Sequence, residues 1–159
     1  VRRSAALTVD ELSLDLFERG SLQRLLDFGH SFSPIIESAA RFTFSHGEAV
    51  AIDMVLSSAI SFVIGLIDHD TYKRIRAVVA ALGLPCDSDL LDEALMEQAV
   101  TAAAKHRAGC ANLVVPRRIG EGSFLGNEQL PRHILTTALA LIRDMPPVTQ
   151  ERHLCIATA

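Results

Sequence analysis

Aromatic residues are scarce in this chain of 159 residues, where they make up 5%, with one Tyr and no Trp. Hydrophobic residues nevertheless amount to 49% and charged residues to 21%. This balance excludes a disordered chain and predicts an aliphatic core built mainly from Ala, Leu, Ile and Val. Because a chain of this length buries about 70% of the surface that its unfolded form exposes, we expect a single domain over residues 1–159.

Cysteine and basic charge are also in short supply. Cys86, Cys110 and Cys155 form no CxxC pair, so no disulfide framework is expected and the reducing cytoplasm is the predicted compartment. Fifteen Lys and Arg against 19 Asp and Glu give a net charge of −4, with no basic block beyond two Arg-Arg pairs. This charge balance argues against nucleic-acid binding.

The chain contains neither an apolar leader at its start nor the glycine motifs GxGxxG and GxxxxGK[ST], so no nucleotide-binding loop is expected. Residues 49–66 alone are apolar enough to raise the question of a membrane span, with Asp53 as their single charge. An aspartate and three serines would be costly in hydrocarbon. We therefore predict the central helix of an α-helical domain and no membrane association.

The remaining pattern is mostly helical. Residues 45–48 (Ser-His-Gly-Glu) fit a capping box for the central helix, which we expect to end near residues 65–68. Further helices are predicted over residues 72–82, from a cap at Asp87 or Asp89 to about Lys105, and from Glu128, capped by Asn127, to Arg143. Two short apolar runs between residues 110 and 125 predict a small β-hairpin. The expected fold class is all-α, with four or five helices and this hairpin.

Two of the six histidines, His30 and His46, precede apolar helices. The positive end of a helix dipole disfavours imidazolium, so His46 is biased towards the neutral form that ligates metals. Asp27 or Glu48 would then be the acceptor that orients a ring. Histidines that only cap a helix or fill the core are the alternative interpretation.

Two other polar groups are candidates. Lys105, His106 and Arg107 stand at the end of a predicted helix, where cations are favoured in any case. Their functional interpretation is a phosphate or polyol clamp. Residues 68–70 (Asp-His-Asp) resemble a ligand cluster, but they begin a helix, so a solvated cap is the simpler interpretation.

The stretches LDFGHSFSPIIE and SHGEAVAIDM resemble the paired metal-site signature of the sugar phosphate cyclases, the dehydroquinate synthase superfamily, which reads LNFGHTxGHAIE and LxHGEAVAIGM. The resemblance covers most of the chain. It implies the helical carboxy-terminal domain of such an enzyme, with His30 and His46 as two of three ligands to zinc or cobalt.

Asp27 stands where this signature has Asn, and Pro34 where it has a second His. Together with AIDM, this pair resembles the branch of sedoheptulose 7-phosphate cyclases that makes 2-epi-5-epi-valiolone. Asp27 offers acceptors to sugar hydroxyls where an Asn amide would also donate. The resemblance implies catalytic roles for Asp27 and Lys105. It implies substrate contacts at Arg24, Asp27, Pro34, Lys105, His106 and Arg107.

Members of this superfamily are longer than this chain. Their amino-terminal half is a Rossmann-like domain that binds NAD, and a Glu that supplies the third zinc ligand precedes the region resembled here. The resemblance therefore implies a separate NAD-binding half as partner, a sugar phosphate substrate, a homodimer and no activity for this chain alone. Three alternatives stay open: a non-catalytic relic that serves as an assembly module, a dehydroquinate synthase, and a related metal-dependent alcohol dehydrogenase.

Overall fold

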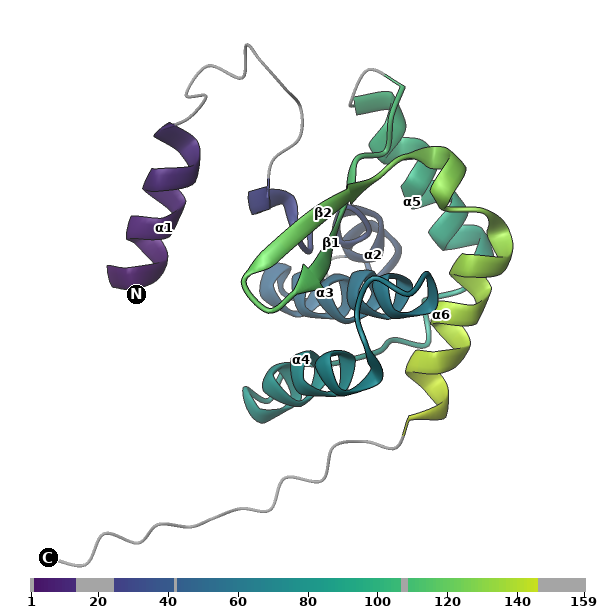
Figure 1. Ribbon diagram of the computed structural model, residues 1–159. Coiled ribbons are helices and arrows are strands. Elements are labelled where there is room, and N and C mark those ends of the chain that lie inside the picture. Colours follow the sequence, from purple (N-terminus) through teal and green to yellow (C-terminus); the bar gives the residue numbers. More distant parts are fainter. Residues whose placement is uncertain (1, 14–24, 42, 107–108, 146–159) are drawn as a thin grey trace, which may run out of the picture.

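The computed structural model describes residues 2–13, 25–41, 43–106 and 109–145 (Figure 1). Its α-helices are α1 (Arg2–Ser13), α2 (Ser33–Ala39), α3 (His46–Val63), α4 (His69–Ala81), α5 (Glu93–His106) and α6 (Arg132–Asp144). Two 3-10 helices, η1 (Leu25–Asp27) and η2 (Asn127–Gln129), and the strands β1 (Leu113–Arg118) and β2 (Glu121–Leu125) complete the described elements. The predicted all-α class with a hairpin is confirmed, with six α-helices in these ranges where four or five were expected.

Helix α3 forms the centre of the domain, as predicted. It packs against α2, α4, α6 and β1, and Figure 1 shows it surrounded by these elements. The helix is long and apolar enough to cross a membrane, but 61% of it is buried inside the protein. Burial on nearly all sides explains why its sequence is apolar all round.

The predicted capping box at the start of α3 is confirmed. The Ser45 hydroxyl accepts a hydrogen bond from the Glu48 backbone N–H at 3.3 Å, and the Glu48 carboxylate accepts one from the Ser45 N–H at 2.8 Å. Helix α3 ends just before Gly65, whose φ of +79° is the left-handed conformation that stops a helix.

The caps of the next two helices follow the prediction only in part. Asp68 caps α4 by accepting from the Thr71 N–H at 2.7 Å, so residues 68–70 do begin a helix. The predicted cap of α5 is wrong. Asp92, which directly precedes α5, accepts from the Leu95 N–H at 2.7 Å, whereas Asp87 accepts from its neighbour Ser88 in a turn.

The hairpin forms as predicted, with β1 antiparallel to β2. The buried Ser61 hydroxyl of α3 donates to the Pro116 carbonyl, which fixes β1 against the central helix. The predicted start of the last helix is wrong, because Pro131 has no N–H to continue a helix and α6 begins only after it. Asn127 does not cap α6; its side chain accepts from Ala111 N–H at 2.8 Å and donates to the Gly109 carbonyl at 2.9 Å.

Candidate metal site

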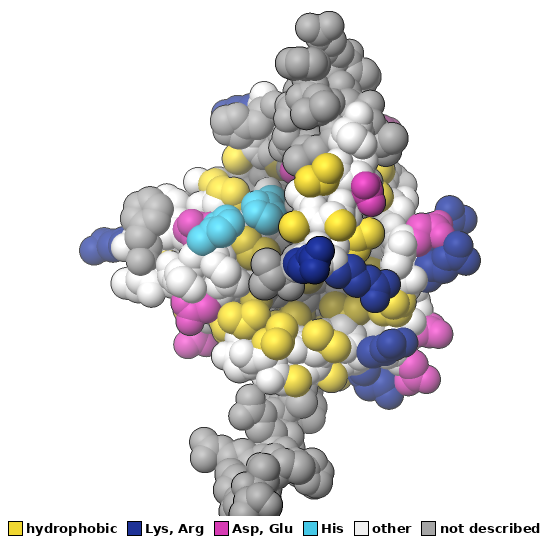
Figure 2. Space-filling model, turned by 90° about the vertical axis from the view of Figure 1, so that its left-hand side faces the viewer, with side chains coloured by type: hydrophobic (Ala, Val, Ile, Leu, Met, Phe, Trp, Pro, Cys, Tyr) yellow, Lys and Arg dark blue, Asp and Glu magenta, His cyan; other side chains and the backbone are white. Residues whose placement is uncertain are grey.

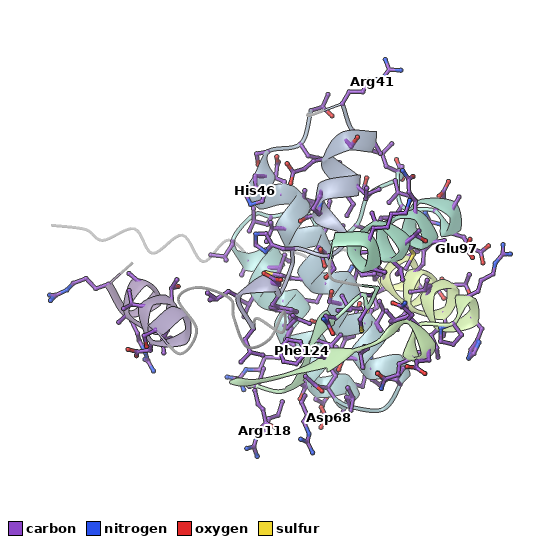
Figure 3. All side chains as sticks on the ribbon, turned by 90° about the horizontal axis from the view of Figure 1, so that it is seen from above. Arg41, His46, Asp68, Glu97, Arg118 and Phe124 are labelled. Carbon is purple, nitrogen blue, oxygen red and sulfur yellow. The ribbon has the colours of Figure 1, made fainter. Side chains whose placement is uncertain are left out.

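His30 and His46, which lie sixteen residues apart in the sequence, are brought together at the surface. Their ring centroids are 5.3 Å apart and the ring planes meet at 55°. His30 lies in the loop before α2, and His46 is the first residue of α3. In the view of Figure 3, His46 lies on the opposite side of the molecule from Asp68, which follows the other end of α3.

The hydrogen bonds of the two rings determine which nitrogen is available. His46 Nδ1 lies 2.8 Å from Glu37 Oε1, and His30 Nδ1 lies 3.3 Å from the Phe28 carbonyl oxygen. Carboxylate and carbonyl oxygens can only accept, so each Nδ1 carries the proton and donates. In the neutral rings, both Nε2 atoms therefore keep a lone pair for a metal ion.

The spacing of the rings fits a shared zinc or cobalt ion. Two imidazoles bound through nitrogen to one tetrahedral zinc at about 2.0–2.1 Å hold their ring centres roughly 5 Å apart, and the observed separation is 5.3 Å. Among the described residues, no group of three or more His, Cys, Asp or Glu side chains is placed to hold a metal. Two histidines are one ligand fewer than the three-ligand set usual for catalytic zinc.

The loop that carries His30 is pressed against α3. Gly29 has a φ of +83°, and a Cβ at this position would come within 2.8 Å of the Met54 side chain and 2.9 Å of the Val50 side chain. Only glycine satisfies both the left-handed conformation and this close approach. The glycine of the first motif therefore has a packing role, because it lets the loop that carries His30 lie close against α3.

Asp53 of α3 holds the same loop from below. It is fully buried and accepts hydrogen bonds from the loop backbone and from Ser57. Burial raises the pKa of the Asp53 carboxyl above its ordinary value, and these hydrogen bonds oppose that shift. The sequence marked Asp53 only as a charge in an apolar helix.

Sequence reasoning assigned the ring-orienting role to Asp27 or Glu48 and overlooked Glu37. In the structure, Glu48 is engaged by Ser45 in the capping box, and its pKa is lowered by those hydrogen bonds. Glu37 orients His46 instead. Its position as the last letter of LDFGHSFSPIIE was the available signal, because a carboxylate inside a metal-site motif is a candidate partner for a ligating histidine.

Three other predicted site residues, Asp27, Pro34 and Lys105, are fully described in the structure. Asp27 ends η1, is buried at 8% exposure, and its carbonyl accepts from the His30 N–H at 2.8 Å. Pro34 is exposed in the first turn of α2. Lys105 is exposed in the last turn of α5, which packs against α2. The His106 side chain, Arg24 and Arg107 lie outside the part that the structure describes.

An apolar groove of about 490 Å³ lies between η1, α3, α4 and the hairpin. Its lining includes the exposed side chains of Val78 and Ile119, with Arg74, Arg118 and Glu121 among the polar members. Figure 2 shows that hydrophobic side chains gather on this face, which also displays histidines.

Comparison with known proteins gives one consistent family. The family described as 3-dehydroquinate synthase C-terminal matches residues 1–106. The 2-epi-5-epi-valiolone synthase of Streptomyces glaucescens is 41% identical over 147 residues, covering 91% of this chain and 38% of that protein. A 3-dehydroquinate synthase of Caldanaerobacter subterraneus is 34% identical over 122 residues, covering 76% of this chain and 34% of that protein.

A solved structure shows the same fold. ValA, the 2-epi-5-epi-valiolone synthase of Streptomyces hygroscopicus, was solved with NAD+ and Zn2+ bound. It matches with a TM-score of 0.84 at 37% identity, over 89% of this chain and 39% of its own. The chain thus spans about two fifths of the length of this protein and of the Streptomyces glaucescens relative. By sequence and by fold, the chain belongs to the family of 3-dehydroquinate synthase carboxy-terminal domains.

Proposed function

We propose that this chain is the metal-binding and substrate-binding half of a sugar phosphate cyclase that converts sedoheptulose 7-phosphate into 2-epi-5-epi-valiolone and phosphate. A separate NAD-binding half would complete the enzyme. The observation that carries the proposal is the pair His30 and His46, at a separation of 5.3 Å and with both Nδ1 atoms engaged. The 2-epi-5-epi-valiolone synthases among the relatives, at 37–41% identity, support the choice of branch.

His30 and His46 would hold zinc or cobalt through Nε2, and Glu37 would fix the orientation of the His46 ring. When bound, the metal would polarise substrate oxygens and NAD would accept and return a hydride. Asp27 would accept hydrogen bonds from sugar hydroxyls, and its burial strengthens such bonds because the local dielectric constant is low.

Phosphate recognition is proposed for the basic residues at and after the end of α5. Lys105 is exposed there, on a helix that packs against α2 and so against the element that follows His30. Arg24, His106 and Arg107 would add charged donors, of which arginine favours bidentate phosphate contacts. Pro34 would leave this side of the site without a titratable group.

The partner would supply the third metal ligand and the nucleotide. Two imidazoles are one ligand fewer than a catalytic zinc site usually has. We therefore expect the chain alone to bind zinc weakly and to release no phosphate, because losing even one positioned group commonly costs a hundredfold or more in rate. The cytoplasm remains the predicted compartment.

Complementation tests this proposal. The chain is mixed with the amino-terminal half of the Streptomyces glaucescens relative, NAD and cobalt, and phosphate release is followed with sedoheptulose 7-phosphate and, separately, with the precursor of dehydroquinate. We expect release from the first substrate only, its loss in His30→Ala and His46→Ala, and wild-type rates in His133→Ala, which removes an exposed histidine of α6. Release from the second substrate alone would identify a dehydroquinate synthase half.

A second candidate function is a non-catalytic assembly module, which the exposed apolar groove favours. Such a module would dimerise or bind an NAD-binding half without any turnover. Sedimentation of the chain at several concentrations, together with Val78→Lys in the groove, separates the two functions. The module would be favoured by two results together: the chain associates and Val78→Lys abolishes this association, and no amino-terminal half activates the chain.

A further inference from the structure

Asp53 is a buried acid whose position in the fold suggests a role beyond packing. It lies on α3, two turns after His46, and its exposure is 0%. A buried carboxylate is costly unless hydrogen bonds satisfy its oxygens. Its partners therefore indicate what the residue is for.

The partners of Asp53 are concentrated in the loop that follows His30. Its Oδ2 accepts from the backbone N–H groups of Ser31 at 2.8 Å, Phe32 at 2.6 Å and Ser33 at 2.9 Å. Its Oδ1 accepts from the Ser57 hydroxyl at 2.9 Å, one turn further along α3. Three consecutive N–H groups thus converge on one oxygen of a side chain from another helix.

These bonds replace a cap that α2 lacks. The first N–H groups of a helix have no partner within the helix and usually bond to the side chain of the residue at the N-cap. Phe32 occupies that position in α2 and makes no side-chain cap. The next residue after Ser33 is Pro34, which has no N–H to satisfy. Asp53 therefore caps α2 from across the core.

We propose that Asp53 is a positioning residue for the metal pair. His46 begins α3, and His30 directly precedes the three N–H groups that Asp53 holds. One carboxylate thus ties the backbone beside one histidine to the helix that carries the other, and so sets the separation of the two rings. The metal part of this inference rests on the proposed function, whereas the loop geometry does not.

The contact of Asp53 with the start of α2 brings together two positions at which the chain departs from the superfamily signature. Asp53 stands where the pattern AIGM has Gly, and Pro34 stands where GHTxGH has its second His. In the structure, Pro34 lies in the first turn of α2, and the Asp53 carboxylate reaches this turn from α3 and accepts the Ser33 N–H.

The loop geometry is tested in the metal-free chain with Asp53→Ala, Asp53→Asn and the control Ser58→Ala. Ser58 is buried on the same helix and its hydroxyl donates only within α3, to the Met54 carbonyl. By nuclear magnetic resonance, we expect Asp53→Ala to shift the amide protons of Ser31 to Ser33 upfield and to weaken the Overhauser contact between the rings of His30 and His46. Asp53→Asn keeps an acceptor oxygen and should restore both signals in large part, with smaller upfield shifts because a neutral oxygen is a weaker acceptor.

Cobalt titration gives the second readout. We expect Asp53→Ala to weaken Co2+ binding about tenfold or more, Asp53→Asn to recover most of the affinity, and Ser58→Ala to match the wild type. A residue that only stabilises the fold would lower the unfolding temperature and leave both the ring contact and the Co2+ affinity of the folded protein unchanged, and that result would overturn the proposal.

Two further outcomes are also decisive. If Asp53→Ala does not fold, Asp53→Asn answers in its place: small upfield shifts of the Ser31 to Ser33 amide protons are expected, and unchanged amide shifts would count against the role. If the wild type binds no Co2+, the metal assignment of the proposed function fails. The amide signals and the ring contact then still decide whether Asp53 positions the two histidines.

Discussion

Glu37 of α2 accepts a hydrogen bond from Nδ1 of His46, the first residue of α3, at 2.8 Å. The carboxylate is the more sheltered partner, with 20% of its side chain exposed against 63% for the histidine. The contact links two helices and at the same time selects the tautomer of the ring, because the carboxylate can only accept. Glu37 therefore leaves Nε2 of His46 available for a ligand.

Glu37→Gln is expected to weaken Co2+ binding about tenfold, because the amide orients the ring less strongly and adds no negative charge behind it. The nitrogen chemical shifts of the His46 ring in the metal-free chain should move towards a mixture of tautomers. Asp70→Asn is the control, since Asp70 pairs with Lys73 on α4. Equal Co2+ affinities and unchanged ring shifts in Glu37→Gln would show that the contact does not position His46.

Gly29→Ala and Gly65→Ala form a matched pair. Both glycines have φ near +80°, at +83° and +79°, but only a Cβ at position 29 would meet neighbours, at 2.8 and 2.9 Å. We expect Gly65→Ala to lower the free energy of unfolding by about 1 kcal/mol for the backbone strain. Gly29→Ala should cost a further 1–3 kcal/mol, roughly, for the overpacking. Urea unfolding measures both, and equal losses would contradict the close packing of the loop on α3.

Tyr72 is fully buried, and its hydroxyl has no hydrogen-bond partner among the described residues. Burial raises the pKa of this phenol to about 12. As the single Tyr of a chain without Trp, it can be followed alone by ultraviolet absorbance. We expect tyrosinate to form only as the pH approaches 12 in the folded chain and near pH 10, roughly, in urea.

The sign of the linked stability follows from this shift. When folding raises the pKa of a phenol, its contribution to the free energy of unfolding is fully present at pH values below the pKa of the unfolded chain. That contribution is lost as the pH rises from about 10 towards 12. Tyr72→Phe should remove this loss. It should also raise the free energy of unfolding at neutral pH by about 1 kcal/mol, because a buried hydroxyl without a partner is gone. The stacking on Phe62, at 6.0 Å between centroids, is retained. A destabilised Tyr72→Phe would reveal a partner for the hydroxyl.

The capping box of α3 is expected to make stability sensitive to acid. Hydrogen bonds from the Ser45 hydroxyl and backbone lower the pKa of Glu48. The contribution of a carboxylate with a lowered pKa is present above its unfolded pKa and is lost as the pH falls through the folded value. Ser45→Ala should therefore destabilise the chain at pH 7 and make a smaller difference at acid pH, as measured by urea unfolding. Ser38→Ala changes an exposed position of α2. Its difference from the wild type in free energy of unfolding should be the same at pH 7 and at acid pH.

The features that were predicted from the sequence depend on neighbours in the chain. Ser45 and Glu48 satisfy each other's backbone three residues apart, and Gly83, with a φ of +74°, stops α4 where it was expected to. The paired motifs predicted His30 and His46 as ligands of one metal ion, and their ring centroids lie 5.3 Å apart in the structure. The capping residues and their hydrogen-bond partners lie within the same short stretch of sequence. The pairing of His30 with His46 came from the family resemblance.

Two of the features that were missed, the contacts of Asn127 and of Asp53, depend on partners far along the chain. Asn127 fits the composition of a cap, but its side chain bonds to Ala111 and Gly109, and Pro131 delays the helix. Asp53 looks like an isolated charge until the fold brings the N–H groups of a loop about twenty residues upstream onto its carboxylate. Neither contact has a periodic or local signature, so a single sequence could not indicate it.

The central position of α3 has a consequence for hydrogen exchange. The most deeply buried amides of a small domain exchange with solvent only when the whole fold opens, and α3 is the helix that carries His46 and anchors the loop of His30. A metal ion held by these two rings would bind the folded chain and not the unfolded one, so it would raise the free energy of the opening that exposes α3. Because only exchange through the opening of the whole fold would be affected, added Co2+ should slow the exchange of α3 amides far more than that of the exposed end of α5.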